Sequence, residues 1–167
     1  MFGIKGLSDS NKIVNHYIDN NDVFFVEIGD PHIKTENKNY VCLPLTQNRN
    51  LFAKYLSSAD IFLNPTQADS FSLLCAEAMS CSTPVVTYNV DAIPEIVMHK
   101  KTGYVAEHNN INDLKRGVEY ILNLSKDSHN NMSQNARKRI VNNFSNEKMY
   151  KKYLELYNTL LHSKNEG

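Results

Sequence analysis

Two acidic residues, Asp69 and Glu77, lie eight positions apart where a polar loop gives way to an apolar helical segment. A carboxylate accepts strong hydrogen bonds from hydroxyl groups, so two neighbouring acids can hold the hydroxyls of a sugar. If both residues are helical, their side chains lie about 80° apart around the helix axis. The pair therefore predicts a site for a hydroxyl-rich ligand.

A second chemical feature lies between the two acids, where the helix is expected to begin. The first residues of a helix carry backbone N–H groups without intrahelical partners, and the helix dipole adds about 0.3 to 1 kcal/mol per bound negative charge. Such a terminus suits a phosphate group. The residues that we expect to present these donors are Ser70, Phe71, Ser72 and Leu73.

Purely structural roles are the alternative for these residues. Asp69 or Ser70 could serve as the N-cap of the helix, a position that favours Asp and Ser. Glu77 lies in a helix that is otherwise apolar from Leu73 to Met79, and a buried carboxylate needs a partner. A buried ion pair of Glu77 is therefore the alternative to a role in ligand binding.

Short apolar runs alternate with segments of helical period along the first two thirds of the chain. The runs predict strands at residues 23–28, 40–43, 60–64, 84–88 and 103–106. Helical periodicity fills the intervals, with Ser8 as a candidate cap for the first helix. This alternation predicts an α/β fold, a Rossmann-like doubly wound parallel sheet. Ligands bind such a sheet beyond the carboxyl ends of its strands, which indicates the loops at 29–31 and 64–72.

The last third of the chain shows only helical signal, from residue 112 to residue 162. Ser145 is a candidate cap for the final helix. No linker rich in Gly, Pro or Ser divides the sequence, and no internal repeat is present. We therefore expect residues 1–167 to form a single domain with a helical C-terminal tail.

Composition narrows the possible functions. The 18 Lys and Arg residues balance the 18 Asp and Glu residues, so the chain lacks the basic character typical of nucleic-acid binding. No apolar run reaches the roughly 18 to 20 residues that span a bilayer, and no signal peptide is apparent. The three cysteines form no Cys-x-x-Cys pair and the six histidines do not cluster. We expect reduced thiols, no metal site and a cytoplasmic location.

An ordered set of motifs extends over nearly the whole chain. It comprises residues 59–66, 69–72, 77–86, 93–97 and 101–105, followed by Phe144-Ser145 and a tyrosine-rich helix. The set resembles the C-terminal, donor-binding signature of retaining GT-B glycosyltransferases of the family 4 type, also described as glycosyl transferases group 1. Each piece alone is weak, but the ordered set is specific.

The resemblance implies roles for the residues of the predicted site. Asp69 would contact the donor sugar, and Glu77 the ribose hydroxyls. The amides of Phe71, Ser72 and Leu73 would hold the diphosphate. The donor is expected to be a UDP- or GDP-sugar, and no metal is required.

Further residues take roles from the same resemblance. Lys5 resembles the basic residue that neutralises the negative charge of the departing diphosphate, with Lys12 as an alternative. A solvated surface lysine is the alternative for either. Gly29 and Leu43 are expected to bind the donor nucleotide, and Pro44 replaces a frequent Gly of the family in the loop expected near the nucleobase.

The sequence also departs from the family pattern. Asp69 stands where the family usually has Glu, and Ser82 where it commonly has Gly. No residue fills the position of the arginine that should precede Lys5. The shorter side chain of Asp69 would change which sugar hydroxyl is contacted, and Ser82 would change the local shape of its loop. The missing arginine would leave less positive charge around the diphosphate.

The resemblance implies that the chain is the donor half of an enzyme, without its N-terminal acceptor domain and first strand. The expected reaction is transfer of a hexose with retention to a glycan or lipid-linked acceptor, in capsular, lipopolysaccharide or exopolysaccharide synthesis. The acceptor would bind through the missing domain, and peripheral association of the complete enzyme with a membrane is compatible with this role. The alternative is a non-catalytic nucleotide-binding or scaffold module derived from such a half.

Overall fold

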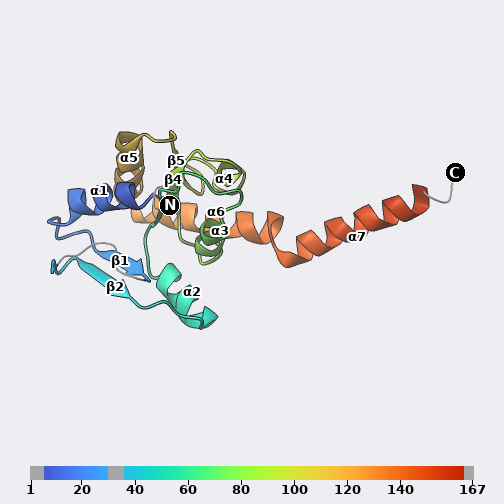
Figure 1. The fold of residues 1–167 in the computed structure, drawn as a ribbon, viewed down its shortest axis with the longest axis horizontal. Helices are drawn as coiled ribbons and strands as arrows, with labels where there is room; N and C mark the ends of the chain where they lie inside the picture. Colours follow the sequence, from blue (N-terminus) through green and yellow to red (C-terminus); the bar gives the residue numbers. More distant parts are fainter. Residues whose placement is uncertain (1–5, 30–35, 164–167) are drawn as a thin grey trace.

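The computed structural model describes residues 6–29 and 36–163 and contains the expected alternation of strands and helices (Figure 1). Its elements in chain order are α1 (Leu7–Tyr17), β1 (Phe25–Ile28), β2 (Tyr40–Leu43), α2 (Arg49–Ser57), β3 (Phe62–Asn64), α3 (Leu73–Ser80), β4 (Val85–Tyr88), α4 (Ile93–Ile96), β5 (Gly103–Ala106), α5 (Ile111–Leu122), α6 (Lys126–Asn143) and α7 (Asn146–Ser163). All five predicted strands are present. β2 and β5 have their predicted ranges, and β1, β3 and β4 begin one or two residues later than predicted.

Every strand pairing in the described residues is parallel, which confirms the predicted α/β class. The strands form two sheets, β1-β2 and β3-β4-β5, where the sequence indicated one. Phe25 is opposite Tyr40 in the first sheet. In the second, Val85 of the central strand is opposite Phe62 on one side and Gly103 on the other.

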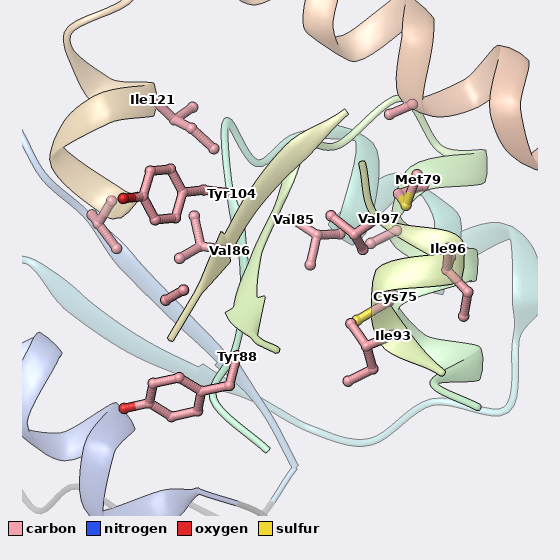
Figure 2. Close-up of a cluster of buried hydrophobic side chains, with 14 of the residues drawn as sticks. Cys75, Met79, Val85, Val86, Tyr88, Ile93, Ile96, Val97, Tyr104 and Ile121 are labelled. Carbon is pink, nitrogen blue, oxygen red and sulfur yellow. The ribbon is translucent and has the colours of Figure 1, made fainter. Parts of the chain in front are cut away.

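The core surrounds β4, whose residues are all buried. Figure 2 shows helix side chains that pack against this strand, among them Cys75, Met79, Ile93 and Ile121. The neighbouring strand approaches closely at Gly103, where an added Cβ would lie 2.2 Å from the Val85 carbonyl oxygen. Glycine is therefore required at this point of the sheet.

Helix α1 begins earlier than the sequence suggested, and Gly6, not Ser8, is its N-cap. Gly6 has a left-handed backbone with φ of 67°, and a Cβ at this position would lie 1.6 Å from the Pro65 carbonyl oxygen. Only glycine combines this backbone with such a close contact. The contact places the start of α1 directly against the loop that follows β3.

The predicted helical tail is confirmed. Helix α6 packs against α3, and α7 then projects away from the body of the molecule (Figure 1). Ser145 caps α7 as predicted, because its hydroxyl accepts a hydrogen bond from the Lys148 amide at 3.4 Å. Among the helices of the described residues, none is long and apolar enough to cross a membrane.

Candidate active site

The predicted site lies on the loop of residues 65–72, which joins β3 to α3 at the carboxyl end of the three-stranded sheet. Asn64, the last residue of β3, closes the base of this loop. Its side-chain amide donates to the Ser72 hydroxyl at 3.1 Å and to the Cys75 sulfur at 3.1 Å. The loop therefore leaves the strand and enters the helix through one shared hydrogen-bond cluster.

Helix α3 begins with its backbone donors free of any side-chain cap. Ser72 is the N-cap and has an extended backbone, and its side chain makes no capping hydrogen bond. The residue is only 1% exposed, because its hydroxyl faces Asn64 inside the loop. The amides of Leu73, Leu74 and Cys75 are therefore those that the helix geometry leaves without intrahelical acceptors.

This helix start corrects two expectations from the sequence. Neither Asp69 nor Ser70 is the N-cap, since the helix begins three residues after Ser70. Ser70 and Phe71 precede the first turn, so their amides belong to the loop. Ser72 is the cap and also contacts Asn64, a contact that the residue types of the two candidate caps, Asp69 and Ser70, could not indicate.

Glu77 faces solvent, which contradicts the buried ion pair considered from the sequence. Within residues 6–29 and 36–163, no hydrogen bond or salt bridge engages its carboxylate. The apolar neighbours of Glu77 in the sequence do not imply burial, because α3 packs on one side only. Its N-terminal residues Leu73 and Leu74 are 67% and 49% exposed. Glu77 follows them by one helical turn and shares their outer side.

Asp69 is half-buried and lies in the loop, three residues before the cap of α3. The estimate of about 80° between the two acids does not apply, because Asp69 is not helical. Its backbone amide donates to the Asp91 carboxylate at 3.0 Å. Asp91 has a left-handed backbone with φ of 45°, in the turn that follows β4.

A buried carboxylate holds the other side of the loop. Asp9, in the first turn of α1, is 8% exposed. One of its oxygens accepts from the Gln67 side chain at 3.1 Å and from the Tyr88 hydroxyl at 2.9 Å. The other oxygen accepts from Lys12 at 2.8 Å. Asp9 thus joins α1, the loop and the end of β4.

The buried groups around the loop are unsuited to nucleophilic chemistry. Burial raises the pKa of the Cys75 thiol, although hydrogen bonds with Ser72 and Asn64 partly oppose the shift. Burial and the hydrogen bond with Asp9 raise the pKa of Tyr88 far above its usual value. The thiol therefore stays protonated at neutral pH, as in a buried cysteine with a structural role.

The remaining predicted residues lie elsewhere. Gly29 and Leu43 meet at the carboxyl ends of β1 and β2, where the Gly29 amide donates to the Leu43 carbonyl at 2.9 Å. Lys5 lies outside the described residues. Lys12 has a 56% exposed side chain and is engaged by Asp9 at 2.8 Å.

Two residues around the loop were not identified from the sequence. Asp91 follows a predicted strand, so the rule that sites lie beyond the carboxyl ends of strands would have indicated it. Asp9 carried no such signal, because its partners Gln67 and Tyr88 lie 58 and 79 positions away. Only the fold brings them together.

Comparison with known proteins gives the family. The model of glycosyl transferases group 1 matches residues 18–139. N-acetyl-alpha-D-glucosaminyl L-malate synthase of Bacillus anthracis is 32% identical over 117 residues, which cover 69% of this chain and 30% of that protein. The capsular polysaccharide biosynthesis glycosyltransferase CapM of Staphylococcus aureus is 26% identical over 125 residues, 70% of this chain and 33% of that protein. The chain spans about a third of the length of these relatives.

Solved structures share the fold. HepE of Anabaena, in complex with UDP-glucose, superposes with a TM-score of 0.77 at 14% identity, covering 95% of this chain and 46% of that one. The C-terminal domain of a group 1 glycosyl transferase, LpcC of Francisella tularensis, gives a TM-score of 0.73 at 17% identity, covering 87% of this chain and 83% of that one. The chain therefore belongs to the glycosyl transferases group 1 family and has the fold of the C-terminal half of a GT-B glycosyltransferase.

Proposed function

We propose that the loop of residues 65–72 and the start of α3 bind the diphosphate and sugar of a nucleotide-sugar donor. The uncapped N-terminus of α3 carries this proposal. Its free amides and the positive end of the helix dipole complement a pyrophosphate. The helix start shifts the donor amides of this proposal to Leu73, Leu74 and Cys75, with Phe71 and Ser72 at the loop side.

The start of α1 supports the same location. Gly6, its N-cap, lies in contact with the Pro65 carbonyl and provides no side-chain cap. The loop is thus bordered by two helix N-termini that lack side-chain caps, from α1 and α3. The positive end of α1 therefore lies beside the loop together with the ion pair of Asp9 and Lys12, while that of α3 carries no acidic residue in its first turn.

The two acids flank this position and supply the sugar contacts of the proposal. Glu77 is exposed and follows Leu73 by one turn, so its carboxylate is available to ribose hydroxyls. Asp69 lies on the loop side, where it would receive hydroxyls of the transferred sugar. Hydrogen bonds from hydroxyls to carboxylates are among the strong ones, at roughly 1.5 to 3 kcal/mol each.

The sheet topology supports a donor half that is completed by one further strand. A Rossmann-like sheet has the strand order 3-2-1-4-5-6. The β1-β2 pair fits positions 2 and 3, and β3-β4-β5 fits positions 4 to 6. One parallel strand from outside the described residues would then join the two sheets between β1 and β3. An acceptor domain would complete the enzyme and bind a glycan or lipid-linked acceptor.

The proposed reaction is hexose transfer from the donor with retention at the anomeric carbon. Negative charge develops on the departing diphosphate, and prearranged donors at α3 would stabilise it without a metal ion. A lysine would add positive charge. Lys5 is the preferred residue, because Asp9 already engages the Lys12 ammonium.

The names of relatives agree with a role in polysaccharide synthesis. CapM is a capsular polysaccharide biosynthesis glycosyltransferase. A further relative, 29% identical over 154 residues, is the Escherichia coli UDP-Gal:alpha-D-GlcNAc-diphosphoundecaprenol alpha-1,3-galactosyltransferase. We therefore propose a UDP- or GDP-hexose as the donor and a growing glycan as the product.

Calorimetric titration of the chain with UDP-, GDP- and ADP-linked sugars tests this proposal. We expect one nucleotide class to bind at up to millimolar concentration and Glu77→Ala to weaken that binding about tenfold. The control is Glu155→Ala on the exposed helix α7, which should leave the affinity unchanged. Failure of every nucleotide sugar to bind the wild-type chain would contradict the proposal.

A further inference from the structure

The loop that carries Asp69 is held from both sides by acids that belong to other elements. Asp9 of α1 accepts from the Gln67 side chain at 3.1 Å. Asp91, in the turn after β4, accepts from the Asp69 backbone amide at 3.0 Å. Because Gln67 and Asp69 are next-nearest neighbours, the two bonds fix the loop immediately before the proposed sugar contact.

Asp91 is the more direct of the two supports. Its bond reaches the backbone of Asp69 itself, so it restrains the peptide from which the Asp69 carboxylate extends. By contrast, Asp9 acts through the long Gln67 side chain and also holds Tyr88 and Lys12.

The backbone of Asp91 is unusual for a residue with a side chain. Its φ of 45° lies in the left-handed region, which favours glycine and tolerates Asn and Asp better than other residues. Strained backbone persists where the surroundings determine it, and it is common at functional sites. Here the strained backbone places a carboxylate oxygen at hydrogen-bonding distance from the Asp69 amide.

The charge of Asp91 has a second consequence. A negatively charged side chain beside the loop would repel Asp69 if their carboxylates faced each other. The hydrogen bond between these residues directs the Asp69 backbone N–H, and not its carboxylate, toward the charge of Asp91. The two acids can therefore lie close together while the Asp69 carboxylate stays available to a ligand.

We propose that Asp91 is a positioning residue that sets the Asp69 carboxylate for the hydroxyls of the donor sugar. This inference rests on the proposed donor site. It assigns Asp91 no contact with the nucleotide. Asp91 should therefore affect recognition of the sugar and leave recognition of the nucleoside diphosphate unchanged.

Three substitutions separate the backbone of Asp91 from its hydrogen bond. Asp91→Asn keeps an acceptor oxygen and tolerates the left-handed backbone, Asp91→Gly keeps the backbone without an acceptor, and Asp91→Ala loses both. Ser82→Gly is the matched control. Ser82 also has a left-handed backbone, with φ of 67°. It lies between α3 and β4 and so precedes the amino end of β4, whereas Asp91 follows the carboxyl end.

The first measurement is calorimetric, with UDP-glucose, UDP-N-acetylglucosamine or GDP-mannose, whichever binds the wild-type chain most tightly, and its nucleoside diphosphate. We expect Asp91→Gly and Asp91→Ala to weaken binding of the sugar nucleotide about tenfold while binding of the diphosphate stays constant. Asp91→Asn and Ser82→Gly should match the wild type. Equal loss in Asp91→Asn and Asp91→Gly would overturn the inference, because the charge and not the acceptor would then matter. Wild-type affinity in Asp91→Gly would also overturn it.

A double-mutant cycle shows whether Asp91 acts through Asp69. In an Asp69→Ala background, the added Asp91→Gly substitution should have no further effect on sugar-nucleotide affinity. A further tenfold loss in that background would overturn the inference and would indicate a direct contact of Asp91.

A third measurement does not depend on donor binding. Exchange of the Asp69 amide proton with water, followed by ¹⁵N NMR in the free chain, should accelerate in Asp91→Gly and remain slow in Asp91→Asn. Acceleration in neither variant would overturn the positioning bond. A protected amide in a chain that binds no nucleotide sugar would instead overturn the proposed function and leave the bond itself supported.

Discussion

The Tyr88 hydroxyl, at the end of β4, donates a 2.9 Å hydrogen bond to the Asp9 carboxylate, 79 positions earlier in the chain. Figure 2 shows this hydroxyl directed from the core toward helix α1. The same Asp9 oxygen accepts from Gln67. One buried oxygen therefore connects the central strand, the first helix and the loop of the proposed site.

Removing the Tyr88 hydroxyl should destabilise the domain. Tyr88→Phe keeps the ring in the core, where the residue is fully buried, but deletes one bond to a charged acceptor. Because such bonds contribute about 1.5 to 3 kcal/mol, we expect the free energy of unfolding to fall by about 2 kcal/mol. Urea unfolding measures it. The control is Tyr153→Phe on the exposed α7, and an equally small change in both variants would refute the anchoring role.

Ser82 offers the opposite case, a substitution that should stabilise. Helix α3 ends in a Schellman motif, in which the Ser82 amide donates to Met79 at 3.0 Å and the Thr83 amide to Ala78 at 3.0 Å. Ser82 occupies the left-handed position of this motif, with φ of 67°, where glycine is preferred.

Ser82→Gly should therefore raise the free energy of unfolding by about 1 kcal/mol, because it removes the strain of a side chain on a left-handed backbone. Ser133→Gly, the same chemical change inside helix α6, should lower it by about 0.5 kcal/mol. Thermal unfolding of both variants shows whether each substitution raises or lowers the free energy of unfolding. A destabilised Ser82→Gly variant would show that the serine side chain contributes more than its backbone costs.

Lowering the pH should reduce the free energy of unfolding of the domain, because Asp113 becomes protonated. Burial raises the pKa of this carboxyl, but hydrogen bonds from the Glu107 amide, the Tyr104 hydroxyl and Arg116 more than compensate, and the net pKa is lowered. A group with a lowered folded pKa contributes stability above its unfolded pKa, about 4, and this contribution is lost as the pH falls through the folded value.

Asp113→Asn should therefore destabilise the chain by about 1 kcal/mol at pH 7 and by progressively less below pH 4. Urea unfolding between pH 3 and pH 7 checks this trend. Asp60→Asn, at an exposed position, is the control and should show a small difference at every pH. A difference between Asp113→Asn and the wild type that grows on acidification would contradict the sign of the shift.

Glu77 should matter for activity and not for folding. Its side chain is exposed, so Glu77→Ala should leave the free energy of unfolding within about 0.5 kcal/mol of the wild type. In an enzyme that combines this chain with an acceptor domain, the same change should reduce turnover about tenfold, because a hydrogen bond to the donor is lost. Steady-state kinetics would reveal this, and wild-type turnover would remove Glu77 from the site.

The strands of this fold could be predicted because each is a short apolar run between turn residues. The run at residues 84–88 becomes β4, whose residues are all buried. The predicted loop at residues 64–72 also follows directly, since it begins where the run before it ends. Parallel pairing and helical crossovers then determine the α/β class.

Three features could not be predicted, and each depends on contacts between distant residues. Ser72 is the N-cap of α3 and also contacts Asn64, whereas Asp69 and Ser70 are equally good caps by residue type. Glu77 is exposed because α3 is covered on one side only, so apolar neighbours did not imply burial. The position of Asp91 after a strand indicates the residue but not its hydrogen bond with the Asp69 amide, because the two residues lie on turns that follow different strands.

Chemical-shift mapping tests the central claim most directly. The ¹⁵N-labelled chain would be titrated with UDP and GDP while the amide resonances are followed by NMR. We expect the largest shifts at Leu73, Leu74 and Cys75, with smaller ones at Asp69 and Glu77, because the diphosphate would lie against the start of α3. Saturating shifts that centre elsewhere, for example on the depression lined by Met98, His99 and Lys101, would contradict the account, as would an unchanged spectrum at millimolar nucleotide.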